Sequence, residues 1–376
     1  MMPDTAPTVL FVSDTNFLDT TRLGGVQRCT QDYLALLHEA GLAVKLHPVR
    51  STRRIGPRVK VRLGVEAYEL YDVDALAPEV VRHAQACAAS VVALNQMSLI
   101  GLAPHLRAAL PGVRVVVLSH GNESGDVVHE MLRAPHIRPH DEWRMGRLIL
   151  REAEGLAHVD AVLCLSETEA HINRWLGTAP AIVVPRTWTL DFLDAEPVPG
   201  RVGFVGTLDH LPNVEGLGRV LDALAVATGG DASGVDVRIV GGPEQPGRDL
   251  AARFAGTSYL GRLSDADFAD EARTWSLFLN PVWWTSRGAS TKLAQALGWG
   301  LPVATTEPGR RGYEWHDGEL LTTDTPAAMA EAILDTVRDP ARTIKVTEAA
   351  RRVARSGPSL ADVAARVRPY LLGAEH

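Results

Sequence analysis

The sequence predicts an α/β protein built from two doubly wound parallel-sheet units, and three observations favour this class. Short apolar runs typical of strands alternate with segments whose apolar residues recur at helical spacing. These runs are apolar on both faces, as in strands that helices cover on both sides. The pattern also begins again after the linker Pro197-Val-Pro-Gly200. A single hydrophobic core rarely grows past about 250–300 residues, so the 376 residues fit two units better than one.

We place the first unit, an acceptor-side Rossmann-like domain, at residues 1–195. Its buried strands are predicted at residues 8–13, 42–48, 90–95, 113–119, 161–165 and 181–184. The helices between them are predicted at residues 26–40, 102–110, 142–156 and 167–176. Gly41 supplies a stop for the first helix. Residues 50–75 are ambiguous, and we expect the stretch Arg50–Arg62 within them to form a surface loop.

The second unit is placed at residues 196–350. Its strands are predicted at residues 202–206, 236–240, 258–260, 277–280 and 302–305. Its helices are predicted at residues 213–226, 248–254, 266–275, 292–299 and 326–337. A charged helical stretch follows with a break at Ser356-Gly-Pro358, and we assign residues 351–376 to a tail that returns to the first unit. A central cleft, beyond the carboxyl ends of the strands of both units, is where we expect the ligand.

The composition excludes several classes of protein. Lys and Arg number 38 against 45 Asp and Glu, a net charge of −7, whereas a binder of duplex nucleic acid usually has a basic surplus. No apolar run approaches the roughly 18–20 residues of a membrane span, and the first residues lack the basic flank and apolar stretch of a signal peptide. We therefore expect a cytoplasmic protein. Cys29, Cys87 and Cys164 are far apart, which predicts buried free thiols rather than disulfides or a zinc site.

Two polar stretches in the first unit have candidate roles. One carries six cations without an acid: Arg50, Arg53, Arg54, Arg58, Lys60 and Arg62. It indicates either a solvated loop or a surface for an anionic acceptor or the inner face of a membrane, because anionic lipid attracts each such charge by about 1 kcal/mol. The other carries His129, His136 and His140, and we interpret it as a loop facing an acceptor rather than a metal site.

Four glycine-bearing turns follow predicted strands. Gly24-Gly25 precedes a helix, so its bare amides and the helix dipole suit an anionic group, although glycines needed only for the turn would look the same. Gly206-Thr207 and Gly241-Gly242 are weaker signals when taken alone. The fourth turn lies within Asn280–Lys292 and is the strongest, because a strand and a small-residue loop lead into a helix start that can cradle a phosphate.

The fourth turn also carries charge. Its small residues are Gly288, Ala289, Ser290 and Thr291. Lys292 would stand in the first turn of the helix, with Arg287 just before the loop. Both cations could neutralise a diphosphate without a metal ion.

At this turn the chain resembles the retaining nucleotide-sugar glycosyltransferases of glycosyltransferase family 4, the group 1 glycosyl transferases, which have the two-domain GT-B fold. The family signature of a small-residue loop, a helix with Leu-Glu-Ala and then Gly-x-Pro-Val-Val reads here Thr291-Lys-Leu-Ala-Gln295 and Gly300-Leu-Pro302-Val-Ala. Similar segments follow the family's order, and the likeness covers about residues 8–340. They are Gly24-Gly25-Val26, Ser119-His120-Gly121, residues 204–213, residues 237–242 and residues 259–265.

The resemblance implies transfer of a sugar from a nucleoside diphosphate sugar, carrying UDP or GDP, to a glycan, lipid-linked or small-molecule acceptor. It implies retention of configuration and no metal or other cofactor. It gives catalytic roles to His120, Arg287 and Lys292, and acceptor contacts to Asn122 and Glu123. The residues it places at the donor are Gly24, Gly25, Gly206, Thr207, Gly241, Gly261, Arg262, Leu263, Gly288, Ala289, Ser290, Thr291 and Gln295.

The chain departs from the family pattern at two places. Family members commonly carry two glutamates with seven residues between them, where this chain has Arg287 and Gln295. Gln295 can still bond a ribose hydroxyl, but Arg287 cannot accept a hydrogen bond. The Arg and Lys that many members have after the first strand of the second unit are replaced by Thr207 and Pro212. A nucleotide-sugar epimerase of the same fold and a non-catalytic sugar-nucleotide-binding member therefore stay open.

Overall fold

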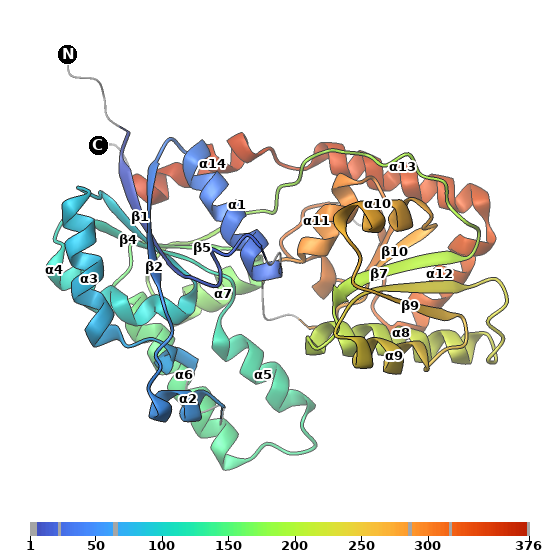
Figure 1. Cartoon of the computed structure of the whole chain (residues 1–376), viewed down its shortest axis with the longest axis horizontal. Coiled ribbons are helices and arrows are strands. Elements are labelled where there is room, and N and C mark those ends of the chain that lie inside the picture. Colours follow the sequence, from blue (N-terminus) through green and yellow to red (C-terminus); the bar gives the residue numbers. More distant parts are fainter. Residues whose placement is uncertain (1–5, 22–23, 63–66, 285–287, 316–317, 374–376) are drawn as a thin grey trace. The chain divides into compact units, whose positions relative to one another are not determined.

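The computed structural model describes residues 6–21, 24–62, 67–284, 288–315 and 318–373. The chain divides into two compact units (Figure 1). Unit 1 comprises residues 1–185, 285–289 and 358–376, and unit 2 comprises residues 186–284 and 290–357. The units therefore divide at 185/186 and 357/358, where the sequence placed boundaries at 195/196 and 350/351.

Unit 1 holds a parallel six-stranded sheet in the order β2-β1-β3-β4-β5-β6. The strands are β1 (Thr8–Asp14), β2 (Ala43–Val49), β3 (Val91–Asn95), β4 (Arg114–Leu118), β5 (Ala161–Cys164) and β6 (Ala181–Val183). The helices are α1 (Gly25–Glu39), α2 (Ile55–Arg62), α3 (Val73–Ala86), α4 (Ala103–Ala109), α5 (Glu123–Arg133), α6 (Pro139–Leu156), α7 (Glu167–Leu176) and α14 (Leu360–Leu372), with short 3-10 turns η1 (Ala67–Leu70) and η2 (Met97–Leu102).

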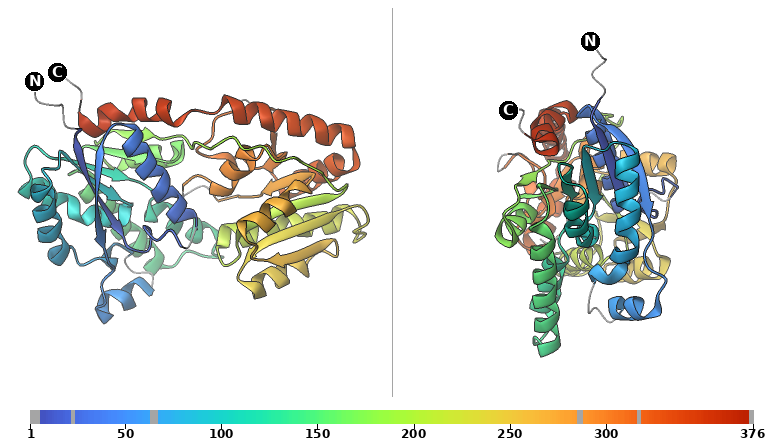
Figure 2. Two further views of the ribbon diagram at one scale, coloured as in Figure 1. Left: turned by 45° about the horizontal axis from the view of Figure 1, so that its top comes forward. Right: turned by 90° about the vertical axis from the view of Figure 1, so that its left-hand side faces the viewer.

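Right-handed crossovers place helices on both faces of this sheet. The chain first steps from β1 to β2 through α1, then returns across β1 to β3 through α3. The helices α1 and α14 accordingly pack together on one face, while α3, α4, α6 and α7 follow one another on the other (Figure 2). Strand β3 is buried over its whole length, which explains its unbroken apolar sequence.

Unit 2 repeats this plan in the order β12-β11-β10-β7-β8-β9, again parallel throughout. Its strands are β7 (Arg201–Thr207), β8 (Asp236–Gly242), β9 (Thr257–Gly261), β10 (Leu277–Asn280), β11 (Val303–Thr305) and β12 (Leu321–Thr322). Its helices are α8 (Leu211–Ala227), α9 (Glu244–Ala251), α10 (Asp265–Arg273), α11 (Thr291–Gly298), α12 (Pro326–Arg338) and α13 (Pro340–Ser356), with the turn η3 (Pro308–Arg310). The helices α8, α9 and α12 pack along one face, and α11 packs with α13. The two sheets and their surrounding helices confirm the predicted α/β class.

Each unit has its own apolar core, and glycines let backbone and rings approach closely in the second. The core of unit 1 lies between its sheet and the helices α3, α4 and α6, and that of unit 2 between its sheet and α8 and α12. A Cβ on Gly203 of β7 would lie 1.9 Å from the Trp275 ring, which is 1% exposed. Only glycine leaves room for that ring. Cys29 and Cys164 are buried free thiols, as predicted, while Cys87 is half-buried and also free.

The structure corrects the sequence interpretation between residues 50 and 140. The expected surface loop at Arg50–Arg62 contains the helix α2. The rest of the ambiguous stretch, to residue 75, includes the start of α3, whose N-cap Asp72 accepts a bond from the Ala75 amide. The expected loop with three histidines is largely helical: His129 lies on α5 and His140 in α6, with His136 between them. Helices with short or mostly exposed apolar stripes give little periodic signal, which is why both were missed.

Candidate functional site

The carboxyl ends of β7, β8 and β9 gather predicted donor residues of unit 2. Gly241 has a φ of +136°, and its Cβ would lie 1.9 Å from the carbonyl oxygen of Gly206. Both the backbone angle and the close approach demand glycine. The Arg262 side chain reaches back over β8, because a Cβ on Gly242 would come within 2.7 Å of its Nε. The other predicted donor residues at this edge are Thr207, Gly261 and Leu263.

The start of α11 is fixed by two side chains. Ser290 is its N-cap: its Oγ accepts from the Leu293 amide at 3.4 Å and donates to Oδ1 of Asn280 at 3.1 Å. Asn280 is fully buried and donates to Thr305 Oγ1 at 3.0 Å and to the Gly309 carbonyl at 2.9 Å. The first turn of α11 has no acid. It is thus a rigidly held helix N-terminus, where partial positive charge favours an anion.

Lys292 stands in this first turn. Its Nζ donates to Oδ1 of Asn213 at 2.5 Å and lies 4.6 Å from the centroid of the Phe204 ring. No acid among the described residues forms an ion pair with it. Burial, and after it the like charge of Arg311, lowers the pKa of Lys292 to about 7. The predicted catalytic Arg287 lies outside the described residues.

Arg311 is a second cation of this site, and the sequence interpretation missed it. It follows η3, and its Nη1 donates to the carbonyl oxygens of Trp284 at 2.9 Å and Pro308 at 2.6 Å. These bonds hold the guanidinium near enough to Lys292 to affect its pKa. Arg311 lies nineteen residues after Lys292 and outside any helix or strand, so no periodic pattern relates the two. Only the turn after β11 brings them together.

The remaining predicted donor residues near α11 differ in what they can do. Thr291 and Gln295 are half-buried on α11, and Ala289 is buried just before it. Gly288 belongs to unit 1, where its amide donates to the carboxylate of the buried Glu169. In this structure that amide therefore donates to a carboxylate, and its role at a phosphate stays a prediction.

In unit 1, the turn after β4 carries His120, and a hydrogen-bond chain sets its tautomer. His120 Nε2 lies 2.8 Å from Oδ1 of Asn95, whose amide nitrogen donates to Ser13 Oγ at 2.9 Å and Thr30 Oγ1 at 3.0 Å. Thr30 uses its own hydroxyl hydrogen on the Val26 carbonyl, so it must accept from Asn95. This fixes the orientation of the Asn95 amide. His120 therefore donates from Nε2, and its Nδ1 carries the lone pair while the ring is neutral.

The backbone around His120 is held as firmly as its ring. Tyr33 donates to the Ser119 carbonyl at 2.7 Å, and its ring centroid lies 5.5 Å from that of His120. The Gly121 amide donates to Ser119 Oγ at 3.1 Å. His120 is half-buried at the carboxyl edge of the sheet, so its position and tautomer suit a group that contacts a ligand.

The glycine turn at the start of α1 keeps its candidate role. Gly24 is the N-cap and Gly25 the first residue of this 15-residue helix, whose first turn has no acid. The Gln27 side chain donates to the Asn16 carbonyl at 3.0 Å, and a Cβ on Gly24 would lie 2.7 Å from Gln27 Oε1. A side chain at position 24 would therefore disturb the contact that closes the loop. The helix start can offer its amides to an anion.

Asn122, an expected acceptor contact, has its hydrogen-bond partners within the protein. It is fully buried, donates to Glu152 Oε2 at 3.3 Å and exchanges side-chain amide bonds with Asn173 at 3.2 and 3.1 Å. Asn122 therefore holds the turn beside His120 from within the protein. Glu123, the other expected acceptor contact, is the first residue of α5 and half-buried.

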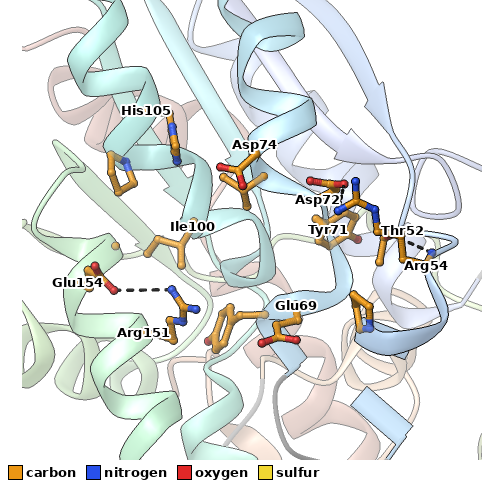
Figure 3. Close-up of a pocket in the computed structure, with 16 residues that line it drawn as sticks. Thr52, Arg54, Glu69, Tyr71, Asp72, Asp74, Ile100, His105, Arg151 and Glu154 are labelled. Atoms are coloured by element: carbon orange, nitrogen blue, oxygen red, sulfur yellow. Dashed lines mark hydrogen bonds and ion pairs between the residues drawn. The ribbon is translucent and has the colours of Figure 1, made fainter. Parts of the chain in front are cut away.

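A pocket of about 430 Å³ lies in unit 1 among α2, η1, α3, η2, α4 and α6 (Figure 3). None of its lining residues was predicted as a site residue. Within the described ranges, no group of three His, Cys, Asp or Glu side chains could hold a metal ion.

Comparisons with known proteins agree on the fold. Residues 199–339 match the family model of the group 1 glycosyl transferases. No curated protein matches the sequence. A sucrose-phosphate synthase from Thermosynechococcus elongatus has a similar structure, with 15% identity, a TM-score of 0.68 and coverage of 96% of this chain and 97% of that one.

Two further solved structures are similar. One, from E. coli, is described as trehalose-6-phosphate bound with UDP-2-fluoro glucose, with 10% identity, a TM-score of 0.62 and coverage of 97% of this chain and 99% of that one. The other is a variant of S. aureus TarM in complex with fondaparinux, alpha-GlcNAc-glycerol and UDP, with 10% identity, a TM-score of 0.57 and coverage of 77% and 58%. At such identities the likeness shows the fold alone, which is the GT-B fold.

Proposed function

We propose that this protein is a glycosyltransferase that takes a sugar from a nucleoside diphosphate sugar, with retention of configuration and without a metal ion. The observation that carries the proposal is a pair of cations: Lys292 in the first turn of α11, and Arg311, which lies near enough to lower the pKa of Lys292. Two like charges held close together, with no acid in the first turn of that helix, suit a multiply charged anion such as a diphosphate. The pair lies within the segment that matches the group 1 glycosyl transferase model.

The chemistry that these residues support is stabilisation of a leaving group. The acceptor oxygen bonds to the anomeric carbon on the face that the diphosphate leaves. The bond from that carbon to the diphosphate oxygen breaks, the oxygen keeps the bonding pair, and the acceptor proton passes to the leaving diphosphate. Lys292 and Arg311 stabilise the negative charge that develops there. His120 lies near the reacting carbon of the donor sugar, and Gln295 bonds the ribose in place of the usual glutamate.

The proposal is tested with a panel of labelled UDP-, GDP- and dTDP-sugars, preceded by thermal-shift measurements with the bare nucleotides. A transferase consumes one donor by transfer or by slow hydrolysis to free sugar and nucleoside diphosphate. Recovery of an isomerised donor with the nucleotide still attached would replace the proposal with an epimerase. Binding of a nucleotide without any turnover would replace it with a non-catalytic sugar-nucleotide-binding protein. If no nucleotide shifted the melting temperature, the assignment of a nucleotide-binding site to this protein would be wrong.

The low pKa of Lys292 predicts that nucleotide binding takes up a proton. In the free protein this amine loses its proton around pH 7, and a bound diphosphate raises its pKa. Between those two pKa values the complex holds more protons than the free protein, so affinity falls as pH rises. We expect the affinity for UDP to drop about eightfold from pH 7.5 to 8.5, where UDP itself no longer titrates.

The proton is counted by titration calorimetry at pH 8 in two buffers of different ionisation enthalpy. Uptake should approach one proton in the parent protein and vanish in Lys292→Met, which keeps the bulk of the side chain over the Phe204 ring. An affinity that is level between pH 7.5 and 8.5 would contradict the assignment of Lys292 to the nucleotide.

The basic stretch of unit 1 leads to a second expectation, that α2 binds anionic membranes. Among its described residues Arg54 pairs with Asp72 at 3.2 Å and Lys60 with Glu69 at 2.8 Å. Arg50, Arg53 and Arg58 form no ion pair with any described residue and remain exposed, as do the apolar side chains on α2, Ile55 and Val59. No helix in the described part of the chain is long and apolar enough to cross a bilayer.

Vesicle co-sedimentation measures this binding. At about 1 kcal/mol per charge, Arg50→Gln, Arg53→Gln and Arg58→Gln together should weaken partitioning onto phosphatidylglycerol vesicles roughly a hundredfold. Salt near 1 M, where the screening length is about 3 Å, should release the parent protein as well. Phosphatidylcholine vesicles serve as the uncharged control. If the triple substitution did not change vesicle binding, the basic stretch would be a solvated surface and not a membrane-binding one.

A further inference from the structure

The pocket of unit 1 has the size and walls of a small-molecule site. Its volume of about 430 Å³ lies within the range of about 300–1,000 Å³ typical of ligand pockets. All of its lining residues come from unit 1 (Figure 3). Its walls combine the apolar Ile100 and Val73 with charged side chains of both signs.

Two buried tyrosines line this pocket and offer it ring surface. Tyr68 and Tyr71 are 8% and 4% exposed. The Tyr68 hydroxyl donates to Glu152 Oε1 at 2.5 Å, and the Tyr71 hydroxyl donates to Asp14 Oδ2 at 2.9 Å. Both hydroxyls are thus satisfied inside the protein. A ligand would meet only the small exposed part of each tyrosine, which adds to the apolar wall formed by Ile100 and Val73.

The charged side chains of the pocket carry an excess of negative charge. Its carboxylates and guanidiniums are Glu69, Asp72, Asp74, Glu154, Arg54 and Arg151. Arg54 lies 3.2 Å from Asp72, Arg151 lies 3.9 Å from Glu154, and Lys60 from outside the pocket lies 2.8 Å from Glu69. Asp74 has no ion pair or hydrogen bond to any described residue. An anionic ligand would therefore meet an unmatched carboxylate, whereas an amine or a hydroxyl would gain a partner.

We propose that this pocket binds one sugar residue of the acceptor, and that it selects an uncharged or amine-bearing sugar against a phosphorylated one; the proposal rests on the transferase function above. The sugar ring packs against the apolar wall formed by Ile100, Val73 and the exposed atoms of the tyrosines, its hydroxyls bond the paired carboxylates and guanidiniums, and an amine pairs with Asp74. In the transfer itself, an acceptor hydroxyl oxygen bonds to the donor carbon, the proton leaves with the nucleoside diphosphate, and the pocket takes part only by binding.

The two tyrosines connect the pocket to the turns that carry His120 and Gly24. Glu152, which accepts from Tyr68, also accepts from the Ser124 amide at 3.0 Å and from Ser124 Oγ at 2.5 Å, just beyond the His120 turn. Asp14, which accepts from Tyr71, also accepts from the Asn16 amide at 2.8 Å, in the loop that leads to Gly24. One side chain therefore separates the pocket wall from each turn. Hydrogen bonds therefore link the wall of the pocket to both turns.

The experiment is saturation-transfer NMR on the full chain without nucleotide, using glucosamine, glucose and glucose 6-phosphate as probes. We expect binding in that order, with glucosamine tightest and glucose 6-phosphate weakest. Asp74→Asn should bring glucosamine down to the level of glucose, a loss of about three- to fivefold for an exposed charge pair. Glu79→Gln, an exposed change on the same helix outside the pocket, is the matched control and should leave all three probes unchanged.

A preference for glucose 6-phosphate, equal binding of glucosamine by the parent and Asp74→Asn, or no saturation transfer at tens of millimolar sugar would each overturn the proposal. Titration of UDP into the same samples separates it from the proposed function. If the protein bound sugars in a way that depends on Asp74 but bound no nucleotide, the pocket would still be a sugar site. Its role as an acceptor site would be rejected. UDP binding without sugar binding would reject the pocket proposal and leave the proposed function standing.

Discussion

Replacing Lys292 by Met is expected to weaken UDP binding by about 10- to 150-fold, because each charged hydrogen bond to a phosphate contributes about 1.5–3 kcal/mol. Methionine keeps the contact with the Phe204 ring and removes only the charge and the donor. Turnover of the donor should fall at least as far, since the same charge stabilises the leaving diphosphate. Calorimetric titration with UDP measures the first effect, and release of nucleoside diphosphate measures the second.

Arg311→Gln should weaken UDP binding by a similar amount and change the pH profile in a way that Lys292→Met cannot. Without the neighbouring guanidinium the pKa of Lys292 rises toward its ordinary value. The fall in UDP affinity with pH should then begin at higher pH. Melting temperatures must accompany the titrations, because Arg311 also holds the carbonyls of Trp284 and Pro308.

Lys345 provides the matched control for both changes. It is an exposed lysine of α13 in the same unit and forms no ion pair with a described residue. Lys345→Met should leave UDP affinity and its pH dependence unchanged. If a folded Lys292→Met protein bound UDP with the affinity of the parent, Lys292 would not contact the nucleotide. If Arg311→Gln left the pH dependence of UDP affinity unchanged, Arg311 would not affect the pKa of Lys292.

The sequence specified the fold well because its strands are buried on both faces. Unbroken apolar runs such as Val91–Asn95 and Ala161–Cys164 read as central strands of a parallel sheet without any tertiary information. The α2 helix shows where that reasoning stops. It begins Ile-Gly-Pro, and only its last five residues alternate basic and apolar side chains. Its Ile55 and Val59 are exposed and pack against no core, so no helical period distinguishes it from a loop.

The candidate site could be predicted only where its residues are close in sequence. Ser290, Thr291 and Lys292 lie in one strand-loop-helix segment, so the sequence of that segment predicts an anion site. Arg311 and Lys292 meet through the turn after β11, and the tyrosines of the pocket bond Glu152 and Asp14, which lie 84 and 57 residues away in the sequence. The partners of Asn122 could not be predicted for the same reason: Glu152 and Asn173 are distant in the sequence, and only the fold brings them to the turn beside His120.

Replacing Glu152 by alanine is expected to lower the free energy of unfolding of unit 1 by about 3–5 kcal/mol. Glu152 is fully buried and accepts from Tyr68, Asn122 and both the amide and the hydroxyl of Ser124. Alanine would leave these buried donors without an acceptor, and each unsatisfied donor costs about 1–3 kcal/mol. The α6 sequence around Glu152 gives no sign of this role, since an acid on a charged helix ordinarily faces water.

Glutamine at the same position separates the charge from the hydrogen bonds. Burial raises the pKa of Glu152, and the bonds from Ser124, Tyr68 and Asn122 oppose that rise without cancelling it. A carboxyl group whose folded pKa is raised loses stabilisation as pH rises through that pKa, so the charged form is a net cost at neutral pH. Glu152→Gln removes this cost but turns one oxygen into a donor that faces other donors. Its loss of stability should therefore be smaller than that of Glu152→Ala and should depend less on pH.

Hydrogen exchange followed by mass spectrometry is the suitable measurement, because a two-unit chain does not unfold in one step. Peptides covering the His120 turn and α5 should exchange faster in Glu152→Ala, while peptides of unit 2 keep the parent rate. Glu154→Ala, an exposed change two residues along the same helix, should leave both sets unchanged. If the His120 turn exchanged at the parent rate in Glu152→Ala, the buried carboxylate would not be what holds that turn. The connection from the pocket tyrosine Tyr68 to His120 would then have no physical support.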